Sequence, residues 1–324
     1  MKVLVTGGTS MLGAGVAKAL QARGDEVTVM QRGSSDLDVA EIRGDVAEPR
    51  DCINACRGQD AVIHLAANVS VAGDWPGFHR VNVAGTGQLV DAARAAGASS
   101  FVQVSSPSVA HAGAPLVGAP ADPADPEHAR GHYARSKALA ERLALAAADD
   151  AFAVVAVRPH LVWGPGDTQL VGRIVERAKQ GRLLLIGGGT ALVDSTYVDN
   201  AVTALVAALD RAADISGRAF VVTNGEPRTV AELLTRICRS ARVPEPRRSV
   251  PAPVATAVGA VVERAWSGLR RDDEPPMTRF LAEQLATAHW FDQRAAREAL
   301  QWQPHVSLEE GFDRLADAFD QAPA

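Results

Sequence analysis

A tyrosine and a lysine four residues apart are the strongest candidates for chemistry in this sequence. Tyr133 and Lys137 lie in an alanine-rich stretch that favours a helix, and residues at this spacing share one helical face. A lysine ammonium beside a phenol favours the phenolate and should lower a tyrosine pKa that is ordinarily ~10. The pair is therefore a candidate acid/base catalyst near neutral pH. The alternative is a chance pair on a surface helix, so the surrounding elements must decide.

The first element that would position such a pair is a glycine-rich turn near the N-terminus. A β-branched run at residues 2–6 leads into Thr6-Gly7-Gly8-Thr9-Ser10-Met11-Leu12-Gly13, and an amphipathic stretch follows to about Arg23. Strand, glycine turn and helix in this order predict a dinucleotide site, with the pyrophosphate at the helix N-terminus. Ser10 replaces the usual middle glycine, and its hydroxyl could donate a hydrogen bond to the phosphates.

The end of the second expected strand, residues 27–31, bears on the choice of cofactor. A carboxylate there would bind the ribose 2′-hydroxyl of NAD, but the sequence reads Gln31-Arg32-Gly33-Ser34-Ser35. A cation with hydroxyls suits a 2′-phosphate, so NADP(H) is favoured and NAD(H) remains possible. The alternative for Arg32 is a solvated loop charge.

Further strands are expected at residues 42–46 and 60–67. Asp45, at the end of the first, could accept a hydrogen bond from the adenine amino group or cap a helix before Pro49. Small residues at the end of the second leave room for a ligand, since ligands of open α/β sheets bind beyond the carboxyl ends of the strands. His64 lies in the apolar run and is expected to be a hydrogen-bonded core histidine.

The remaining pattern alternates helix and strand. Residues 78–97 predict a long helix, 101–105 a strand, 111–130 a surface loop, 133–149 a helix, and 153–157 and 219–223 further strands. This alternation predicts an α/β fold, a Rossmann-type doubly wound parallel sheet with a smaller, mostly helical C-terminal substrate domain. We expect residues 1–165 and about 190–224 in the NAD(P)-binding domain, and about 166–189 and 225–324 in the substrate-binding domain.

Bulk properties narrow the class of protein. The chain has 324 residues, 47% hydrophobic and 22% charged, with a net charge of −5, which gives no general attraction to nucleic acid. No apolar run approaches the ~20 residues of a membrane span, and because a strand is expected directly after Met1 we expect no leader. Three cysteines form neither a disulfide framework nor a zinc pattern, so we expect a cytoplasmic protein without a metal.

Taken in order, these motifs resemble the extended short-chain dehydrogenases/reductases over essentially the whole chain. The resemblance is carried by the glycine turn, Asp45, the strand end at residues 64–67, Asn82, Ser105-Ser106, Tyr133-x-x-x-Lys137 and Arg158-Pro159. Residues 158–167 and 192–200 resemble the 3β-hydroxysteroid dehydrogenase-like branch. Residues 106–109 and 274–285 are similar to bacterial 2-alkyl-3-oxoalkanoate reductases of olefin biosynthesis, which belong to that branch.

The resemblance implies a mechanism and a set of site residues. Ser106 would bind the substrate oxygen, Tyr133 would exchange the proton, and Lys137 would hold the cofactor ribose, with Ser105 as the second choice for the serine. Residues implied to contact cofactor are Gly7, Thr9, Ser10, Met11, Leu12, Gly13, Arg32, Asp45, Val46, Leu65, Ala66, Ala67, Asn82, Tyr133, Lys137, Pro159 and His160. Residues expected to contact substrate are Ser108, Leu161, Trp163 and Arg279.

The expected activity is the interconversion of a ketone and a secondary alcohol on a hydrophobic substrate, either 3-oxo fatty-acid-like or 3β-hydroxysteroid-like. Apolar residues 161–163 favour a lipid-like substrate, although they could be core packing. The alternatives are a nucleotide-sugar epimerase/dehydratase on the same fold and a non-catalytic NADP-binding regulator. Pro107 and Ser108 stand where a dehydratase of this family carries an acidic pair. Relatives pair through the helices near 78–97 and 130–149, which implies a homodimer.

Overall fold

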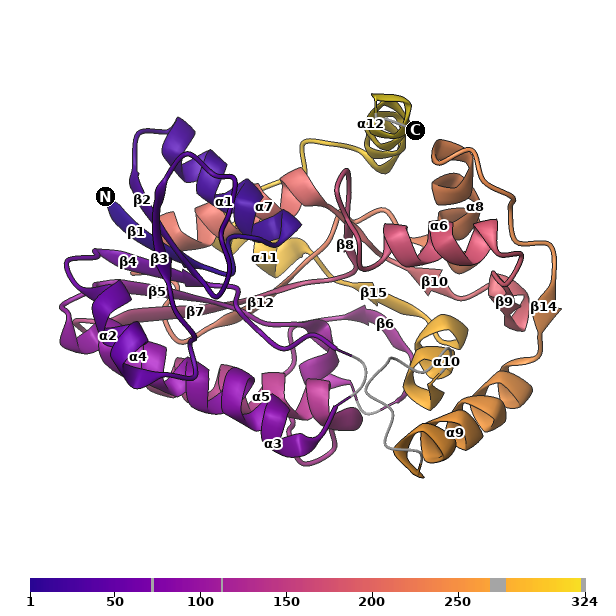
Figure 1. The fold of residues 1–324 in the computed structure, drawn as a ribbon, viewed down its shortest axis with the longest axis horizontal. Coiled ribbons are helices and arrows are strands. Elements are labelled where there is room, and N and C mark those ends of the chain that lie inside the picture. Colours follow the sequence, from indigo (N-terminus) through magenta and orange to yellow (C-terminus); the bar gives the residue numbers. More distant parts are fainter. Residues whose placement is uncertain (71–72, 112, 269–277, 322–324) are drawn as a thin grey trace.

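The computed structural model describes residues 1–70, 73–111, 113–268 and 278–321. Its centre is a seven-stranded parallel sheet in the order β12-β7-β5-β4-β1-β2-β3, flanked by helices on both faces (Figure 1). The strands are β1 Lys2–Thr6, β2 Glu26–Gln31, β3 Ala40–Arg43, β4 Ala61–His64, β5 Ser100–Val104, β7 Ala153–Pro159 and β12 Ala219–Val222. The predicted doubly wound sheet is confirmed.

Two apolar cores, one on each face, hold this sheet. On one face, α1 (Met11–Ala22) and α7 (Val198–Asp210) cover β1, β4, β5 and β7. On the other face, α2 (Pro49–Cys56), α4 (Gly85–Ala95) and α5 (Gly131–Ala146) bury the opposite side chains of the same strands. Alternating burial on both faces explains why these strands read as continuous apolar runs.

The turns between strand and helix follow from local sequence. Helix α1 begins after Ser10, whose side chain accepts the Gly13 N–H, and the chain leaves it through Gly24 at φ +94°. The expected helix over 78–97 begins earlier, as α3 (Trp75–Phe78), passes through a π-helical turn (His79–Ala84) and continues as α4. The third strand also differs from expectation, since β3 ends at Arg43 and Asp45 lies beyond it.

A second, smaller sheet joins segments far apart in the chain. Its order is β13-β10-β15-β6, from Arg228–Thr229, Leu192–Val193, His289–Phe291 and Leu116–Ala119. Residues 111–130, expected to be a loop, therefore contain a strand that pairs parallel with β15. Short pairs β11 (Thr196–Tyr197) with β8 (Val162–Trp163), and β14 (Ser249–Val250) with β9 (Leu185–Ile186), complete the strands of the described residues.

Helices dominate the part of the molecule beyond the carboxyl ends of the large sheet. They are α6 (Val171–Lys179), α8 (Val230–Ser240), α9 (Ala252–Gly268), α10 (Arg279–Ala286) and α12 (Leu308–Gln321), with α11 (Arg294–Leu300) returning beside β12 (Figure 1). Short 3₁₀ turns occur at Pro107–Ala110 and Gly187–Gly189. Strands β6 and β10 and helix α11 connect the large sheet with the mostly helical part of the molecule. The domain boundaries expected from the sequence therefore stay a prediction. Within the described residues, no helix is long and apolar enough to span a bilayer.

Candidate active site

The glycine turn is shaped by close backbone contacts. Gly7 has φ +78° and lies so near the end of β4 that an added Cβ would be 3.0 Å from the Ala66 nitrogen. A Cβ at Gly13 would collide with the Gly7 carbonyl oxygen. The turn therefore requires glycine at both positions and directs backbone N–H groups at the start of α1 outward, which fits a dinucleotide pyrophosphate.

Ser10 has a different role from the one expected. Its hydroxyl donates to the Gly7 carbonyl at 2.8 Å and accepts the Gly13 N–H at 3.0 Å. Because a hydroxyl has one proton and this one is used within the turn, Ser10 caps α1 and does not donate to a phosphate in this arrangement. Thr9, Met11 and Leu12 lie in the same turn and first helical residues.

One carboxylate near the end of β2 was not predicted from the sequence. Glu41, on the neighbouring strand β3, accepts from the Ser35 N–H at 2.7 Å, from the Ser35 hydroxyl at 2.8 Å and from the Gln31 amide at 2.9 Å. These hydrogen bonds, chiefly those from Ser35, hold the pKa of Glu41 below its usual range. Arg32 is exposed on the same loop. The sequence carried no local signal for this acid, because its contact with Ser35 depends on the register of β2 on β3.

Asp45 and Val46 lie in the connection between β3 and α2. The Asp45 carboxylate accepts the Ala47 N–H at 2.9 Å and lies 3.4 Å from the guanidinium of Arg80. It does not cap the following helix, because Glu48 occupies the N-cap position of α2. The hydrogen bond to Ala47 therefore fixes the Asp45 carboxylate within the connection between β3 and α2.

The strand end at residues 64–67 is fixed by a polar chain through the core. The Thr6 hydroxyl meets His64 Nδ1 at 2.7 Å and accepts the N–H groups of Leu65 at 3.2 Å and Ala66 at 3.1 Å. His64 Nε2 lies 3.1 Å from the Thr86 hydroxyl. Burial lowers the pKa of His64 to about 3, so this histidine is neutral. The expected hydrogen-bonded core histidine is confirmed, and Leu65, Ala66 and Ala67 remain partly accessible beside Gly7.

Asn82 ties this strand end to the helix that carries the tyrosine. Its amide donates to Ser136 Oγ at 2.9 Å and to the Asn68 carbonyl at 3.0 Å, and its oxygen accepts the Asn68 N–H at 2.7 Å. The π-helical turn widens the helix here and presents Asn82 to α5. Asn82 is fully occupied by these partners and positions the surrounding backbone.

Ser106, Tyr133 and Lys137 come together beyond β5. Ser106 precedes a 3₁₀ turn and accepts a hydrogen bond from the Ser108 hydroxyl at 3.0 Å, and its side chain lies beside the Tyr133 phenol. Lys137, one helical turn further on α5, is 4% exposed and donates from Nζ to the Val104 carbonyl at 2.6 Å. Ser105, the second choice, is buried and its hydroxyl has no hydrogen-bond partner among the described residues.

The direction of the tyrosine pKa shift corrects the expectation from sequence. Burial of the phenol raises the pKa of Tyr133, and the neighbouring Ser106 hydroxyl only partly offsets this rise. Burial also lowers the pKa of Lys137 to about 8, while the Glu141 carboxylate one turn later acts to raise it. Both shifts have one cause, because a site withdrawn from water disfavours the charged forms of both residues. Tyr133 therefore keeps its proton at neutral pH.

The segment that follows β7 contains both buried residues and residues that are accessible to solvent. Pro159 ends β7, and His160 is buried with Nδ1 2.6 Å from the Asp194 carbonyl oxygen. Leu161 is exposed at φ +44°. Trp163 is 0% exposed, stacks on Phe312 at 4.5 Å between ring centroids, and donates from its indole to Ser195 at 3.0 Å. Trp163 is thus a core residue, and the expectation that it faces substrate is corrected.

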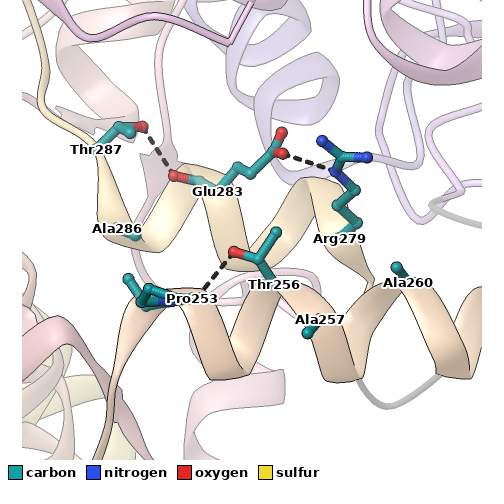
Figure 2. Close-up of a pocket in the computed structure, with 9 residues that line it drawn as sticks. Pro253, Thr256, Ala257, Ala260, Arg279, Glu283, Ala286 and Thr287 are labelled. Atoms are coloured by element: carbon teal, nitrogen blue, oxygen red, sulfur yellow. Dashed lines mark hydrogen bonds and ion pairs between the residues drawn. The ribbon is translucent and has the colours of Figure 1, made fainter.

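Arg279 lies far from Tyr133 along the chain and borders a cavity on α10. A cavity of about 520 Å³ lies between α9 and α10, with Arg279 and Glu283 on its α10 wall (Figure 2). The Arg279 Nε is 2.9 Å from Glu283 Oε1, and the other carboxylate oxygen is 2.5 Å from the guanidinium of Arg130, directly before α5. Arg130 was not singled out in the sequence. No cluster of three or more potential metal-binding side chains occurs in the described part of the chain.

Comparison with known proteins agrees with this geometry. The sequence matches the NAD dependent epimerase/dehydratase family over residues 3–223. It is 42% identical to a 2-alkyl-3-oxoalkanoate reductase of Stenotrophomonas maltophilia, over 97% of this chain and 98% of the relative. It is 30% identical to the Homo sapiens sterol-4-alpha-carboxylate 3-dehydrogenase, decarboxylating, over 97% of this chain and 87% of that protein.

A solved structure supports the fold. The UDP-glucose 4-epimerase of Thermus thermophilus, solved in complex with NAD, superposes with a TM-score of 0.73 at 24% identity and covers 100% of both chains. An identity this low speaks to the fold alone. Together, the family match and the relatives show that the chain belongs to the NAD dependent epimerase/dehydratase family of extended short-chain dehydrogenases/reductases.

Proposed function

We propose that this protein is an NAD(P)(H)-dependent oxidoreductase that interconverts a ketone and a secondary alcohol on a hydrophobic, 3-oxo fatty-acid-like substrate. The observation that carries the proposal is that the Tyr133 phenol lies beside Ser106, with Lys137 one helical turn away on α5. The names of the relatives, an oxoalkanoate reductase and a sterol-carboxylate dehydrogenase, support the same chemistry.

Ser106, Tyr133 and Lys137 have separate roles in the proposed reaction. Ser106 orients the substrate oxygen, and Tyr133, kept protonated by its raised pKa, donates a proton to that oxygen as the ketone is reduced. Lys137 places a positive charge under the site, which stabilises the phenolate left after proton transfer. A nicotinamide cofactor, when bound at the glycine turn, supplies the hydride. In the oxidative direction the same groups move the proton back.

The finer features of the proposal concern cofactor and assembly. The exposed Arg32 at the end of β2 supports a preference for NADP(H), whereas the nearby Glu41 carboxylate opposes that preference. A homodimer through α4 and α5 is supported by the family resemblance. A cytoplasmic location is supported by three buried free cysteines, Cys52, Cys56 and Cys238.

A substrate panel tests the proposal. The purified protein is assayed with NADPH and with NADH against a 2-alkyl-3-oxoalkanoate, a 3-ketosteroid and UDP-glucose. We expect cofactor oxidation with the oxoalkanoate. Epimerisation of the sugar nucleotide without cofactor turnover on any ketone would refute the proposal, and cofactor binding with no turnover at all would favour the regulator.

A further inference from the structure

Lys137 is enclosed by protein on the inner face of α5. Its side chain is 4% exposed, and Nζ donates to the Val104 carbonyl at 2.6 Å. Tyr133 lies one turn earlier on this helix and Glu141 one turn later, and the charge of Lys137 also acts on His64 of β4. Burial lowers the pKa of His64 to about 3, so that ring is neutral at the pH of catalysis. The carboxylate that acts on Lys137 is that of Glu141.

The other charged side chains of the elements around α5 are exposed, with one exception. Those on α4 and on the π-helical turn beside α5 are His79, Arg80, Asp91 and Arg94. The charged residues of α5 itself, apart from Lys137 and Glu141, are also exposed, and solvent and salt screen such charges. The exception is Arg158 on β7, which is 1% exposed.

Arg158 binds both oxygens of the Glu141 carboxylate. Its Nε donates to Oε2 at 2.8 Å and its Nη2 donates to Oε1 at 2.5 Å. Strand β7 places Arg158 beside this site, because the preceding Val157 is opposite Val104 on β5, whose carbonyl binds Lys137. Lys137, Glu141 and Arg158 therefore lie in one buried layer between α5 and the carboxyl ends of β5 and β7.

Two cations in this layer interact with a single carboxylate. Because a guanidinium that binds both oxygens satisfies most of the carboxylate, Glu141 attracts the Lys137 ammonium less than an unpaired carboxylate would. Burial prevails and lowers the pKa of Lys137 to about 8, although Glu141 acts to raise it. Replacing a buried pair by apolar residues is often close to neutral for stability, so the fold alone does not require these charges.

We propose that Glu141 and Arg158 are positioning residues that set the fraction of Lys137 carrying a charge: Glu141 favours the ammonium form, and Arg158, by holding Glu141, limits that effect. The consequence of this inference for turnover rests on the proposed reductase function. Lys137 stabilises the phenolate of Tyr133 only while it is charged, so a pair that fixes this charge also fixes the pH range in which the proton is transferred.

NMR of the lysine side chains measures this charge without turnover. The lysines of the sequence are Lys2, Lys18, Lys137 and Lys179. The full-length protein labelled with ¹³C at the lysine Cε position therefore gives four lysine signals, and Lys137→Met identifies the relevant one. In wild type this signal should titrate with a midpoint near pH 8, because burial lowers the pKa of Lys137 to about 8.

The two single variants should move this midpoint in opposite directions. Glu141→Gln removes the anion and leaves Arg158 unpaired, so the midpoint should fall by at least ~1 pH unit, a tenfold change in the protonation equilibrium. Arg158→Met frees Glu141 to act on Lys137, so the midpoint should rise by at least ~1 pH unit. A purely structural role would admit water in both variants and raise both midpoints. Midpoints that move in the same direction, or that both move by less than about 0.3 pH unit, would overturn the inference.

A double variant keeps the test decisive if a single variant does not fold. Arg158→Met with Glu141→Leu leaves neither charge unpaired and should be close to wild type in stability. Because Glu141 acts on Lys137 directly and Arg158 acts through Glu141, the midpoint should still fall, by about 0.5 pH unit. A midpoint equal to that of wild type or above it would contradict the assignment.

A matched control removes an arginine from the surface of the same helix. Arg142 on α5 is 55% exposed and pairs with Glu127. Arg142→Met makes the same substitution as Arg158→Met, and the Lys137 midpoint should stay within about 0.2 pH unit of wild type, because exposed charges are screened. A rise as large as that in Arg158→Met would attribute the effect to net charge, and the assignment would fail.

Turnover separates this inference from the proposed function. The pH at which kcat/KM for the 2-alkyl-3-oxoalkanoate falls on the alkaline side should follow the NMR midpoint in wild type and in each variant. If the midpoints shift as expected but wild type reduces no ketone, the proposed function fails while the assignment of Glu141 and Arg158 stands. If wild type reduces the ketone and the midpoints do not shift, the assignment fails while the proposed function stands.

Discussion

Replacing Arg158 should destabilise the protein strongly, because it holds a charge inside the core. Arg158 and Glu141 are each 1% exposed and form a two-pronged pair, Nε to Oε2 at 2.8 Å and Nη2 to Oε1 at 2.5 Å. The remaining Nη1 donates to the Asp122 carbonyl at 2.7 Å. Arg158→Met removes all three bonds and leaves the buried Glu141 carboxylate, on the helix that carries Tyr133, without the guanidinium that binds both of its oxygens.

The expected magnitude follows from this geometry. Breaking a buried pair by removing one partner costs about 3–5 kcal/mol, whereas replacing both by apolar residues is often close to neutral. Arg158→Met should therefore lower the free energy of unfolding by about 3–5 kcal/mol. Arg158→Met with Glu141→Leu should recover most of this loss, because Asp122 is exposed and water can replace the bond to its carbonyl.

Urea unfolding followed by tryptophan fluorescence measures these differences, with wild type, both single variants and the double variant compared at one pH. The double-variant cycle isolates the coupling between the two charges. A loss below about 1 kcal/mol in Arg158→Met, or a double variant no more stable than Arg158→Met, would refute the reasoning that Glu141 is an ionised, paired carboxylate.

Three further predictions concern pH and cofactor. Because burial lowers the pKa of Lys137 to about 8, kcat/KM should fall as pH rises above about 8; a flat profile from pH 7 to 10 would contradict this. Burial lowers the pKa values of His64 and His289 to about 3, so the unfolded chain takes up their protons first. The stability they contribute is complete above about pH 6.5 and is lost as pH falls below it, by up to ~1.4 kcal/mol per pH unit for each histidine. Urea midpoints equal at pH 7 and 4.5 would argue against this. Glu41→Gln should favour NADPH over NADH by about 10-fold relative to wild type, and Arg32→Gln should do the reverse; KM ratios unchanged in both variants would exclude this loop as the selector.

Much of the large sheet was predictable because its signals are local. The turn at Gly7 and Gly13 and the alternation of apolar strands with amphipathic helices each depend on a few neighbouring residues. The small sheet was not predictable, since it pairs strands such as Leu116–Ala119 with His289–Phe291, which are short and far apart in the chain. Of the motif at residues 274–285 that resembles the 2-alkyl-3-oxoalkanoate reductases, residues 274–277 lie outside the described residues.

The candidate site was predictable in its membership more than in its electrostatics. Spacing placed Tyr133 and Lys137 on one face, but burial, which raises the tyrosine pKa, is a property of the folded chain. Trp163 was predicted to line a pocket, because the apolar residues next to it in the sequence do not indicate that Phe312 covers its ring. Glu41 and Arg130 were not predicted because their partners lie on other elements. The register of β3 on β2 decides which groups Glu41 contacts, and the partner of Arg130 lies on α10.

The most direct test of the central claim compares Tyr133→Phe with wild type for turnover and cofactor affinity. Removing only the phenolic oxygen takes away the proposed proton donor beside Ser106, while the ring and the packing of α5 remain. We predict that turnover of the 2-alkyl-3-oxoalkanoate falls by a factor of at least ~100 and that the Kd for NADPH stays within about twofold of wild type. Near-normal turnover in Tyr133→Phe would contradict the account.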